Sequence, residues 1–150
     1  MEQGLADNFD DVVVAVGSGG TACGLAVANH LAGSPVRVHA FSVSDHKGYF
    51  HHHIDQTLEE LGLLGSINSR GIINIVDGYK GAGYGLSQPH ELAYIAEVAQ
   101  STGIVLDSTY TGKAVVGLRD LLSGAAAPGT LAGNRVLFLH TGGLFGLFDG

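Results

Sequence analysis

A short stretch rich in glycine and hydroxyl side chains, Val16 to Thr21, has the residue types that bind a phosphate. It reads Val-Gly-Ser-Gly-Gly-Thr and joins a run of β-branched residues to a stretch of small residues. Such a junction leaves backbone N–H groups unpaired at the start of a helix, where the helix dipole adds partial positive charge. Gly19 and Gly20 let an anion approach the backbone, and Ser18 adds a hydroxyl donor, as does the final threonine. The loop therefore predicts a phosphate or carboxylate site that needs no lysine or arginine.

Two kinds of ligand match this loop, and the residues alone leave both open. The loop fits the loose G-x-G-x-x-G/A pattern of dinucleotide-binding proteins, and Asp45 follows beyond the next strand, where such proteins bind the ribose. A cofactor with a single phosphate would use the same amides and take the rest of its pocket from later loops, here with Tyr84, Tyr110 and Thr141. The Gly-Tyr-Gly and His-Thr-Gly-Gly sequences around these residues favour the monophosphate, because a nicotinamide enzyme has no evident use for them.

The segments that must position these residues alternate between strand and helix patterns. Val12 to Val16 is a continuous apolar run typical of a parallel strand buried on both faces. We expect strands over 12–16, 36–43, 72–76, 104–106 and 135–139. We expect helices over 22–32, 49–61, 89–101 and 112–122, with a small-residue linker over 124–133. Because strands that alternate with helices form right-handed βαβ units, the sequence predicts an α/β fold, a parallel twisted sheet with helices on both faces.

One edge of this sheet collects the residues that could do chemistry. Ligands of such sheets bind outside the carboxyl ends of the strands. This rule selects the segments 17–20, 44–45, 77–85, 107–112 and 140–143. Glycines in any single loop can simply make a tight turn. Their recurrence with Ser, Thr and Tyr at one edge indicates a shared binding site.

Composition and charge exclude several classes of protein. The 150 residues are enough for one domain with a buried core, and 7 Lys+Arg against 14 Asp+Glu give a formal net charge of −7. With no basic surplus, neither nucleic acid nor an anionic membrane is expected as a partner. The single cysteine, Cys23, rules out an internal disulfide framework. Consecutive histidines at 51–53 point around a helix rather than to one side, so we predict no metal site.

The chain carries no sequence signal for membrane insertion or export. No apolar run reaches the ~18 residues that a membrane span needs. The N-terminal stretch has Glu2 and Asp7 where a leader peptide has Lys or Arg. We therefore expect a protein of the cytoplasm or of an organelle matrix, with no targeting segment in this chain.

Four motifs in a fixed order give the sequence a family resemblance. They are Val-Gly-Ser-Gly-Gly-Thr at 16–21, Gly-Tyr-Gly at 83–85, Leu-Asp-Ser-Thr-Tyr-Thr-Gly-Lys-Ala at 106–114 and His-Thr-Gly-Gly at 140–143. From about residue 11 to the end, the chain resembles the D-cysteine desulfhydrase and aminocyclopropane-carboxylate deaminase family. The resemblance implies pyridoxal 5'-phosphate as the cofactor and the large-domain fold of a fold type II enzyme, similar to tryptophan synthase β. The family commonly has Pro-Val where this chain has Ser-Thr, just before the expected active-site tyrosine.

The resemblance also implies roles for individual residues. It assigns the cofactor phosphate to Ser18, Gly19, Gly20 and Thr21. It implies that Tyr84 and Tyr110 are catalytic. Their phenol groups would lie on the substrate face and transfer protons. It implies that Thr141 and Thr111 contact the pyridine nitrogen of the cofactor. The deaminases usually have Glu where Thr111 stands. A hydroxyl leaves the nitrogen less protonated, which suffices to eliminate a thiolate, so the resemblance favours a desulfhydrase.

The lysine that such chemistry requires is missing from its expected place. The chain has only Lys47, Lys80 and Lys113. The family's Schiff-base lysine, and the segment that grips the substrate carboxylate, lie well upstream of the Gly-Ser-Gly-Gly-Thr loop. We interpret Lys80 as a loop lysine and Lys113 as a solvated or structural helix lysine. Residues 1–150 are therefore predicted to be the C-terminal cofactor-binding portion of a tryptophan synthase β-like domain, without the N-terminal lysine-bearing portion.

The predicted function is that of a pyridoxal-phosphate-dependent lyase that converts D-cysteine to pyruvate, sulfide and ammonia. This chain alone is expected to be inactive, because it lacks the lysine. Its expected partners are a small amino-acid substrate and either a second copy, as in a dimer, or the missing N-terminal half. Two other classes stay open: an inactive family remnant that acts as a subunit of a larger assembly, and a Rossmann-type nucleotide-binding module.

Overall fold

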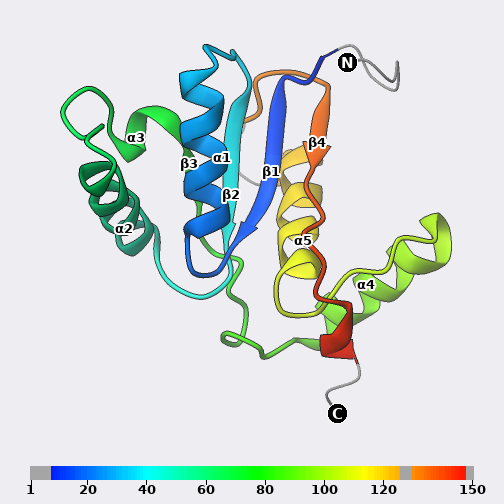
Figure 1. The fold of residues 1–150 in the computed structure, drawn as a ribbon. Helices are drawn as coiled ribbons and strands as arrows, with labels where there is room; N and C mark the ends of the chain where they lie inside the picture. The colour runs from blue at the N-terminus through cyan, green and yellow to red at the C-terminus, as the bar shows by residue number, and fades with distance from the viewer. Residues whose placement is uncertain (1–7, 126–129, 148–150) are drawn as a thin grey trace.

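A parallel sheet of four strands forms the centre of the structure, a computed structural model that describes residues 8–125 and 130–147. The strands stand in the order β3-β2-β1-β4 (Figure 1). Their bounds are β1 Asp11–Val16, β2 Arg37–Ser42, β3 Asn74–Val76 and β4 Val136–Phe138. β1 pairs in parallel with both β2 and β4, and β2 pairs in parallel with β3. The predicted parallel α/β sheet is confirmed.

Helices cover both faces of this sheet, as predicted. α1 (Gly20–Leu31) and α2 (Lys47–Glu60) lie on one face, and α5 (Thr111–Leu122) lies on the other (Figure 1). α4 (Pro89–Thr102) packs against α5. The remaining elements are the one-turn helix α3 (Ser69–Ile72) and a 3-10 helix, η1 (Leu144–Leu147). The four long helices begin and end within two residues of their predicted bounds.

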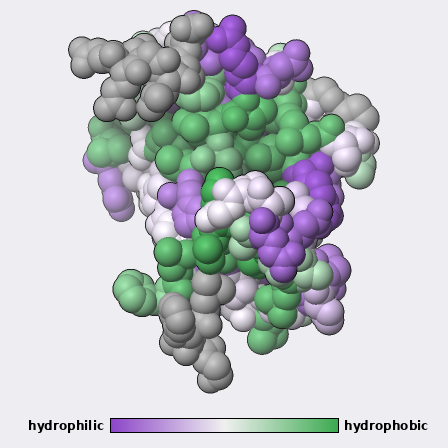
Figure 2. All heavy atoms as spheres, turned by 90° about the vertical axis from the view of Figure 1, so that its right-hand side faces the viewer, coloured by the Kyte–Doolittle hydropathy of each residue, from purple (hydrophilic) through white to green (hydrophobic). Residues whose placement is uncertain are grey.

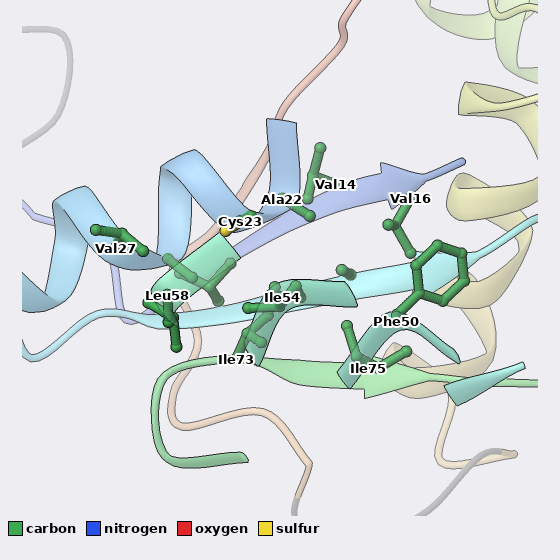
Figure 3. Close-up of a cluster of buried hydrophobic side chains, with 13 residues drawn as sticks. Val14, Val16, Ala22, Cys23, Val27, Phe50, Ile54, Leu58, Ile73 and Ile75 are labelled. Atoms are coloured by element: carbon green, nitrogen blue, oxygen red, sulfur yellow. The ribbon is translucent and has the colours of Figure 1, made fainter. Parts of the chain in front are cut away.

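The larger part of the apolar core fills the space between the sheet and the helices α1 and α2. Side chains of Val14 and Val16 from β1, Ile75 from β3, and Phe50 and Ile54 from α2 belong to one buried cluster (Figure 3). A smaller cluster on the opposite face consists of Val13, Phe41 and Ala114. Because both faces of the sheet are covered, five of the six residues in β1 are buried, and the strand reads as a continuous apolar run.

Local sequence signals explain where two of the helices begin. α2 starts after His46, whose Nδ1 accepts a hydrogen bond from the backbone N–H of Tyr49 at 3.1 Å. α4 starts at Pro89, a residue suited to the first helical position because the missing N–H would be unpaired there. The Glu91 carboxylate then accepts from the backbone N–H of Gln88 at 2.6 Å and completes a capping box.

The prediction of a strand over 104–106 is wrong. Ile104 and Val105 are exposed, and the segment pairs with none of the strands described. Its hydrogen bonds go to side chains instead. The Val105 carbonyl accepts from His140 Nε2 at 2.8 Å, and the N–H of Ile104 donates to Oγ1 of Thr102 at 3.1 Å. The third expected strand is also shorter than predicted, because the unexpected helix α3 includes its first residue.

A row of polar residues, of which Asp11 and His39 are buried and Asn74 is half-buried, crosses the sheet near the amino ends of its strands. His39 Nε2 lies 2.7 Å from Oδ1 of Asp11, and its Nδ1 lies 3.1 Å from the side-chain amide nitrogen of Asn74. The Asp11 carboxylate also accepts from the backbone N–H groups of Ala132 and Gly133. Burial by itself raises the pKa of Asp11, but these hydrogen bonds and the nearby His39 together hold it below the ordinary value of 3.8.

This network should make the protein less stable in acid. A carboxyl group with a lowered pKa in the folded state stabilises the fold fully above its unfolded value of 3.8, and the contribution is lost as the pH falls through the folded pKa. We expect the free energy of unfolding of Asp11→Asn to change less than that of the wild type between about pH 6 and about pH 2. Urea denaturation across this range measures both slopes. Equal slopes would contradict the assignment, and the exposed Glu97→Gln serves as control.

The side of the molecule that carries β4 is apolar and only partly covered. Figure 2 shows a broad hydrophobic area on this side. Val136, Leu137 and Phe138 are each half-buried, and β4 pairs with only one strand of the described chain. An unpaired edge with apolar side chains is a surface that proteins normally cover or protect.

Three parts of the chain lie outside the described residues: the N-terminal stretch 1–7, in which no leader was expected, part of the expected linker, 126–129, and residues 148–150. Among the helices that the structure describes, none is long and apolar enough to cross a membrane.

Candidate active site

A cavity of about 510 Å³ opens at the carboxyl end of the sheet, where the loops that follow the strands meet. All five segments selected from the sequence contribute to its wall. The continuous stretch from the end of β1 into α1 supplies seven of the thirteen lining residues, and the later segments supply Ser44, Tyr84, Tyr110 and Thr141 to Gly143. None of the lining residues has a charged side chain. A ligand in this cavity would therefore meet backbone amides, hydroxyls and phenols.

The loop from β1 into α1, residues 17–21, forms the end of the cavity predicted to bind a phosphate. Gly19 is the N-cap of α1, and no side chain caps the helix. Ser18 and Thr21 are exposed, and neither hydroxyl has a partner among the residues described. Unpaired N–H groups and free hydroxyls at one helix end supply the hydrogen-bond donors that an anion needs.

Two glycines of this loop have no room for a side chain. A Cβ on Gly17 would lie 2.5 Å from Cε1 of Tyr110, and a Cβ on Gly19 would lie 2.7 Å from Cδ2 of His53. Gly19 also has a φ of 106°, in the left-handed region that favours glycine. Ser44 fixes the loop by donating from its Oγ to the Gly17 carbonyl at 2.6 Å. The loop is thus held as a bare backbone surface at a helix start, and its donors fit the phosphate of the expected cofactor.

Tyr84 and Tyr110 come together at this cavity from separate loops. Their hydroxyls are hydrogen-bonded to each other, and their ring centroids lie 5.8 Å apart with an angle of 73° between the ring planes. The hydrogen bond from Tyr84 and, to a lesser degree, burial raise the pKa of Tyr110 to about 12. The negative charge of Asp107 adds to this effect. Tyr110 therefore keeps its proton at neutral pH and can act as a proton donor.

A buried carboxylate that the sequence reasoning missed holds Tyr110 in place. Oδ2 of Asp107 accepts from the backbone N–H groups of Thr109 at 2.8 Å and Tyr110 at 2.7 Å. Its Oδ1 accepts from the backbone N–H and the hydroxyl of Thr111, at 2.7 and 2.6 Å. The side chain is only 2% exposed. An aspartate just before a helix start commonly caps it in this way, and this signal could have identified Asp107.

The structure brings most of the sequence-predicted site residues together. Those that line the cavity are Ser18, Gly19, Thr21, Tyr84, Tyr110 and Thr141. Gly20 is the first residue of α1, next to them in the chain. Thr111 is not brought to the cavity, because its side chain is buried and its hydroxyl donates to Asp107. Of the two threonines assigned to the pyridine nitrogen, only Thr141 lines the cavity.

The three lysines of the chain do not line this cavity. Lys47 and Lys80 are exposed. Lys113 is fully buried, and its Nζ donates to three backbone carbonyls of the loop that carries Tyr84. It is therefore a structural lysine rather than a solvated one.

Other side chains with reactive groups are engaged elsewhere. Cys23 is buried in α1, and burial raises the pKa of its thiol, which favours the unreactive form. The consecutive histidines contact different neighbours. Nδ1 of His51 lies 3.0 Å from Oγ of Ser69, whereas the ring of His53 stacks on Tyr49 with 6.2 Å between centroids. Successive positions on a helix point in different directions, as the sequence analysis expected of these residues.

A larger cavity of about 630 Å³ lies beside β3 and α3. Lys47, Arg70 and Asn74 are among its lining residues, and none of the sequence-predicted site residues lines it. Volume alone would favour this cavity. The glycines, hydroxyls and phenols that could bind a phosphate and move protons all gather at the smaller one, which is therefore the candidate active site.

The chain is also similar to known proteins. The sequence profile of the family described as "Pyridoxal-phosphate dependent enzyme" matches residues 1–142. The chain is 44% identical over 141 residues to the "Bifunctional D-cysteine desulfhydrase/1-aminocyclopropane-1-carboxylate deaminase, mitochondrial" of Arabidopsis thaliana, which covers 94% of this chain and 34% of that protein. It is 34% identical over 140 residues to the "D-cysteine desulfhydrase" of Serratia proteamaculans, over 93% of this chain and 42% of that protein.

A solved structure shares the fold. A structure described as "Crystal Structure Analysis of the ACC deaminase homologue" superposes on this chain with a TM-score of 0.81 and 31% sequence identity. The match covers 97% of this chain and 43% of the chain in that structure. The chain thus spans between about a third and less than half of the length of these relatives. The fold, the cofactor class and the family resemblance predicted from the sequence are confirmed by these matches. This chain belongs to the family of pyridoxal-phosphate-dependent enzymes.

Proposed function

We propose that this chain is the C-terminal, cofactor-binding portion of a pyridoxal-phosphate-dependent lyase that converts D-cysteine to pyruvate, sulfide and ammonia. The observation that carries the proposal is the cavity in which an uncharged phosphate loop meets the paired hydroxyls of Tyr84 and Tyr110. Support comes from two related proteins, from Arabidopsis thaliana and Serratia proteamaculans, whose names include D-cysteine desulfhydrase.

In this proposal the loop at 17–21 holds the cofactor by its phosphate. The unpaired N–H groups of the first turn of α1 and the hydroxyls of Ser18 and Thr21 would donate the hydrogen bonds. Thr141, which also lines the cavity, would meet the pyridine nitrogen. Once bound, the cofactor supplies an electron sink for breaking bonds at the substrate α-carbon.

The tyrosine pair would move protons at the substrate. Tyr110 keeps its proton at neutral pH, since its hydrogen bond with Tyr84 raises its pKa to about 12. A neutral phenol is a donor, so Tyr110 would protonate the departing sulfur of the substrate. Tyr84 is 53% exposed and would pass a proton from solvent to Tyr110 through the hydroxyl contact.

The wall of the cavity favours elimination of a thiolate over the deaminase reaction. A carboxylate against the pyridine nitrogen would keep that nitrogen protonated and make the ring strongly electron-withdrawing. None of the lining residues is a carboxylate. If the hydroxyl of Thr141 met the pyridine nitrogen, it would leave that nitrogen less protonated than a carboxylate would. That is sufficient for a thiolate, which leaves readily. This preference rests on Thr141 and not on Thr111, whose hydroxyl is bound to Asp107.

The proposal requires a lysine and a substrate-carboxylate site from outside this chain. The three lysines present do not line the cavity, and the chain spans 34% of its Arabidopsis relative. An upstream portion of the same protein would supply the lysine and the carboxylate site. The protein would act as a homo-oligomer, such as a dimer, in the cytoplasm or an organelle matrix. An inactive remnant that serves a larger assembly would differ in lacking that lysine. Family membership leaves the Rossmann-type nucleotide-binding module without support.

Tyr110→Phe tests the function in the protein that carries this chain together with the lysine-bearing portion. We expect unchanged affinity for pyridoxal phosphate and a loss of about 100-fold or more in turnover of D-cysteine, because the ring stays and the phenol proton goes. Sulfide and pyruvate release at saturating substrate measure the turnover. Tyr94→Phe, which removes the hydroxyl of a tyrosine that does not line the cavity, is the matched control. If Tyr110→Phe and Tyr84→Phe both turn over D-cysteine like the wild type, neither phenol has the assigned role.

A further inference from the structure

One buried ammonium group fastens the glycine-rich loop between β3 and α4. Nζ of Lys113, in the first turn of α5, donates to the carbonyl oxygens of Lys80, Gly83 and Leu86 at 2.7, 2.7 and 2.8 Å. A lysine ammonium has three N–H donors, so all of them are used. Lys113 is 0% exposed, and all three of its acceptors belong to the backbone of this one loop.

Two of these three acceptors flank Tyr84. The N–H of Leu86 donates to the Gly83 carbonyl at 3.1 Å, which closes a tight turn with Tyr84 and Gly85 at its tip. Gly85 has a φ of 72°, as such a turn requires. Because the carbonyls on both sides of the turn bind the same Nζ, the position of Lys113 sets the position of the turn and of the tyrosine that it carries.

The same helix end carries the partner of Tyr84. Tyr110 is the N-cap of α5, one turn before Lys113. The start of α5 therefore contacts the loop at two points, with Lys113 at the base of the turn and the Tyr110 hydroxyl at its tip. Tyr84 is 53% exposed, so packing alone restrains it weakly. The contacts of Lys113 with the backbone tie the turn to the helix that begins at Tyr110, and Oγ of Ser87 adds a hydrogen bond to the Ser108 carbonyl at 3.2 Å.

A buried carboxylate compensates the charge of Lys113. Glu91 is 4% exposed and is held at the start of α4 by the backbone N–H of Gln88. The loop lies against it, since a Cβ on Gly81 would be 2.6 Å from its Oε1. Burial lowers the pKa of Lys113 and the nearby Lys80 lowers it further, whereas the Glu91 charge acts in the opposite direction. A buried charge is costly unless hydrogen bonds and an opposite charge offset it, and Lys113 has three carbonyl acceptors and the nearby charge of Glu91.

We propose that Lys113 is a positioning residue that holds the Tyr84 hydroxyl against that of Tyr110. Its effect on catalysis rests on the proposed function, whereas its effect on the tyrosine pair does not. Lys113 takes no direct part in the chemistry, because its Nζ is saturated by carbonyls and the residue does not line the cavity.

Lys113→Met tests the inference without cofactor or substrate. Methionine has a similar length but cannot donate to the carbonyls. We expect the turn to loosen, the contact between Tyr84 and Tyr110 to be lost, and the pKa of Tyr110 to fall from about 12 toward its ordinary value of 10. NMR of protein with 13C-labelled tyrosine rings follows Tyr110 between about pH 8 and about pH 11, where the variant should titrate and the wild type should not. Asp107 remains beside Tyr110 in both proteins, so the difference reports on Tyr84.

Matched variants make this result decisive. Tyr84→Phe should shift the Tyr110 titration in the same way. Lys80→Met removes an exposed ammonium from the same loop but keeps its carbonyl, and should leave the titration unchanged. Wild-type titration in folded Lys113→Met would overturn the inference. If that variant does not fold, Lys113→Arg keeps the charge and changes the donor geometry. A lowered Tyr110 pKa in it supports the inference, and an unchanged one overturns it.

Activity separates this inference from the proposed function. In the protein that includes the lysine-bearing portion, Lys113→Met should lower kcat for D-cysteine at least about tenfold, with unchanged cofactor affinity. Combining it with Tyr84→Phe should cause no further loss, since both changes remove the same contact. Additive losses would overturn the inference. If Tyr84→Phe has wild-type turnover while the Tyr110 titration shifts as expected, the catalytic role of the pair is wrong and the positioning by Lys113 holds.

Discussion

Asp107→Ala is expected to lower the free energy of unfolding by about 3 kcal/mol or more, because each buried donor left unpaired costs about 1–3 kcal/mol. The carboxylate accepts from three backbone N–H groups and one hydroxyl in the turn that leads into α5. The N–H of Tyr110 is one of these donors, so the change should also displace the tyrosine from the cavity. Urea denaturation followed by circular dichroism measures the loss.

Two further variants test whether the carboxylate of Asp107 is what holds the turn. Asp107→Asn keeps the size of the side chain and one acceptor oxygen, so its loss should be smaller than that of Asp107→Ala. Glu97→Ala removes an exposed carboxylate from the middle of α4 and should change the stability by no more than about 0.5 kcal/mol. If Asp107→Ala loses less than Asp107→Asn, the carboxylate is not what holds the turn.

The combined change of Ser18→Ala and Thr21→Ala is expected to weaken pyridoxal-phosphate binding about 100-fold. A hydrogen bond to a charged group contributes about 1.5–3 kcal/mol, at least a factor of ten for each hydroxyl. Neither hydroxyl is committed to another group of the described chain, and no cation lines the cavity to replace them. Equilibrium titration of the cofactor-free protein, followed by the absorbance of the cofactor, measures the affinity.

Pyridoxal without its phosphate provides the internal comparison for this loop. It should bind the wild type and the double variant with the same affinity, because the lost donors serve only the phosphate. Ser66→Ala, which changes an exposed serine that does not line the cavity, should leave both affinities unchanged. An unaltered affinity of the double variant for pyridoxal phosphate would remove this loop from the cofactor site.

Most of the fold could be predicted because each element has a local signal. The valine run of β1 is apolar on both faces, which only a doubly covered parallel strand requires. Pro89 and Glu91 mark the start of α4 within its first turn. The edge of the sheet that carries the site followed from strand direction alone, and the cavity found there is lined by all five selected segments.

The features that were missed depend on contacts between distant segments. The segment 104–106 has the apolar residues of a strand, but such a run says nothing about whether a partner strand is available. Lys113 and its acceptors are 27 to 33 residues apart, so no local pattern marks it as a buried ammonium. Thr111 was assigned to the pyridine nitrogen by motif, yet the direction of its side chain is decided by Asp107.

The position of β4 beside β1 has a consequence for how the site is made. β1, β2 and β3 follow one another closely in the chain, whereas β4 must return across the whole domain. Asp10 and Arg135, which are hydrogen-bonded next to the β1–β4 pair, are 125 residues apart. Closing so long a segment costs chain entropy and slows folding. The phosphate loop can therefore form early, but Thr141 and Gly143 follow β4 and reach the cavity only when that strand docks. A ligand that contacts both the phosphate loop and Thr141 therefore needs β4 in its place beside β1.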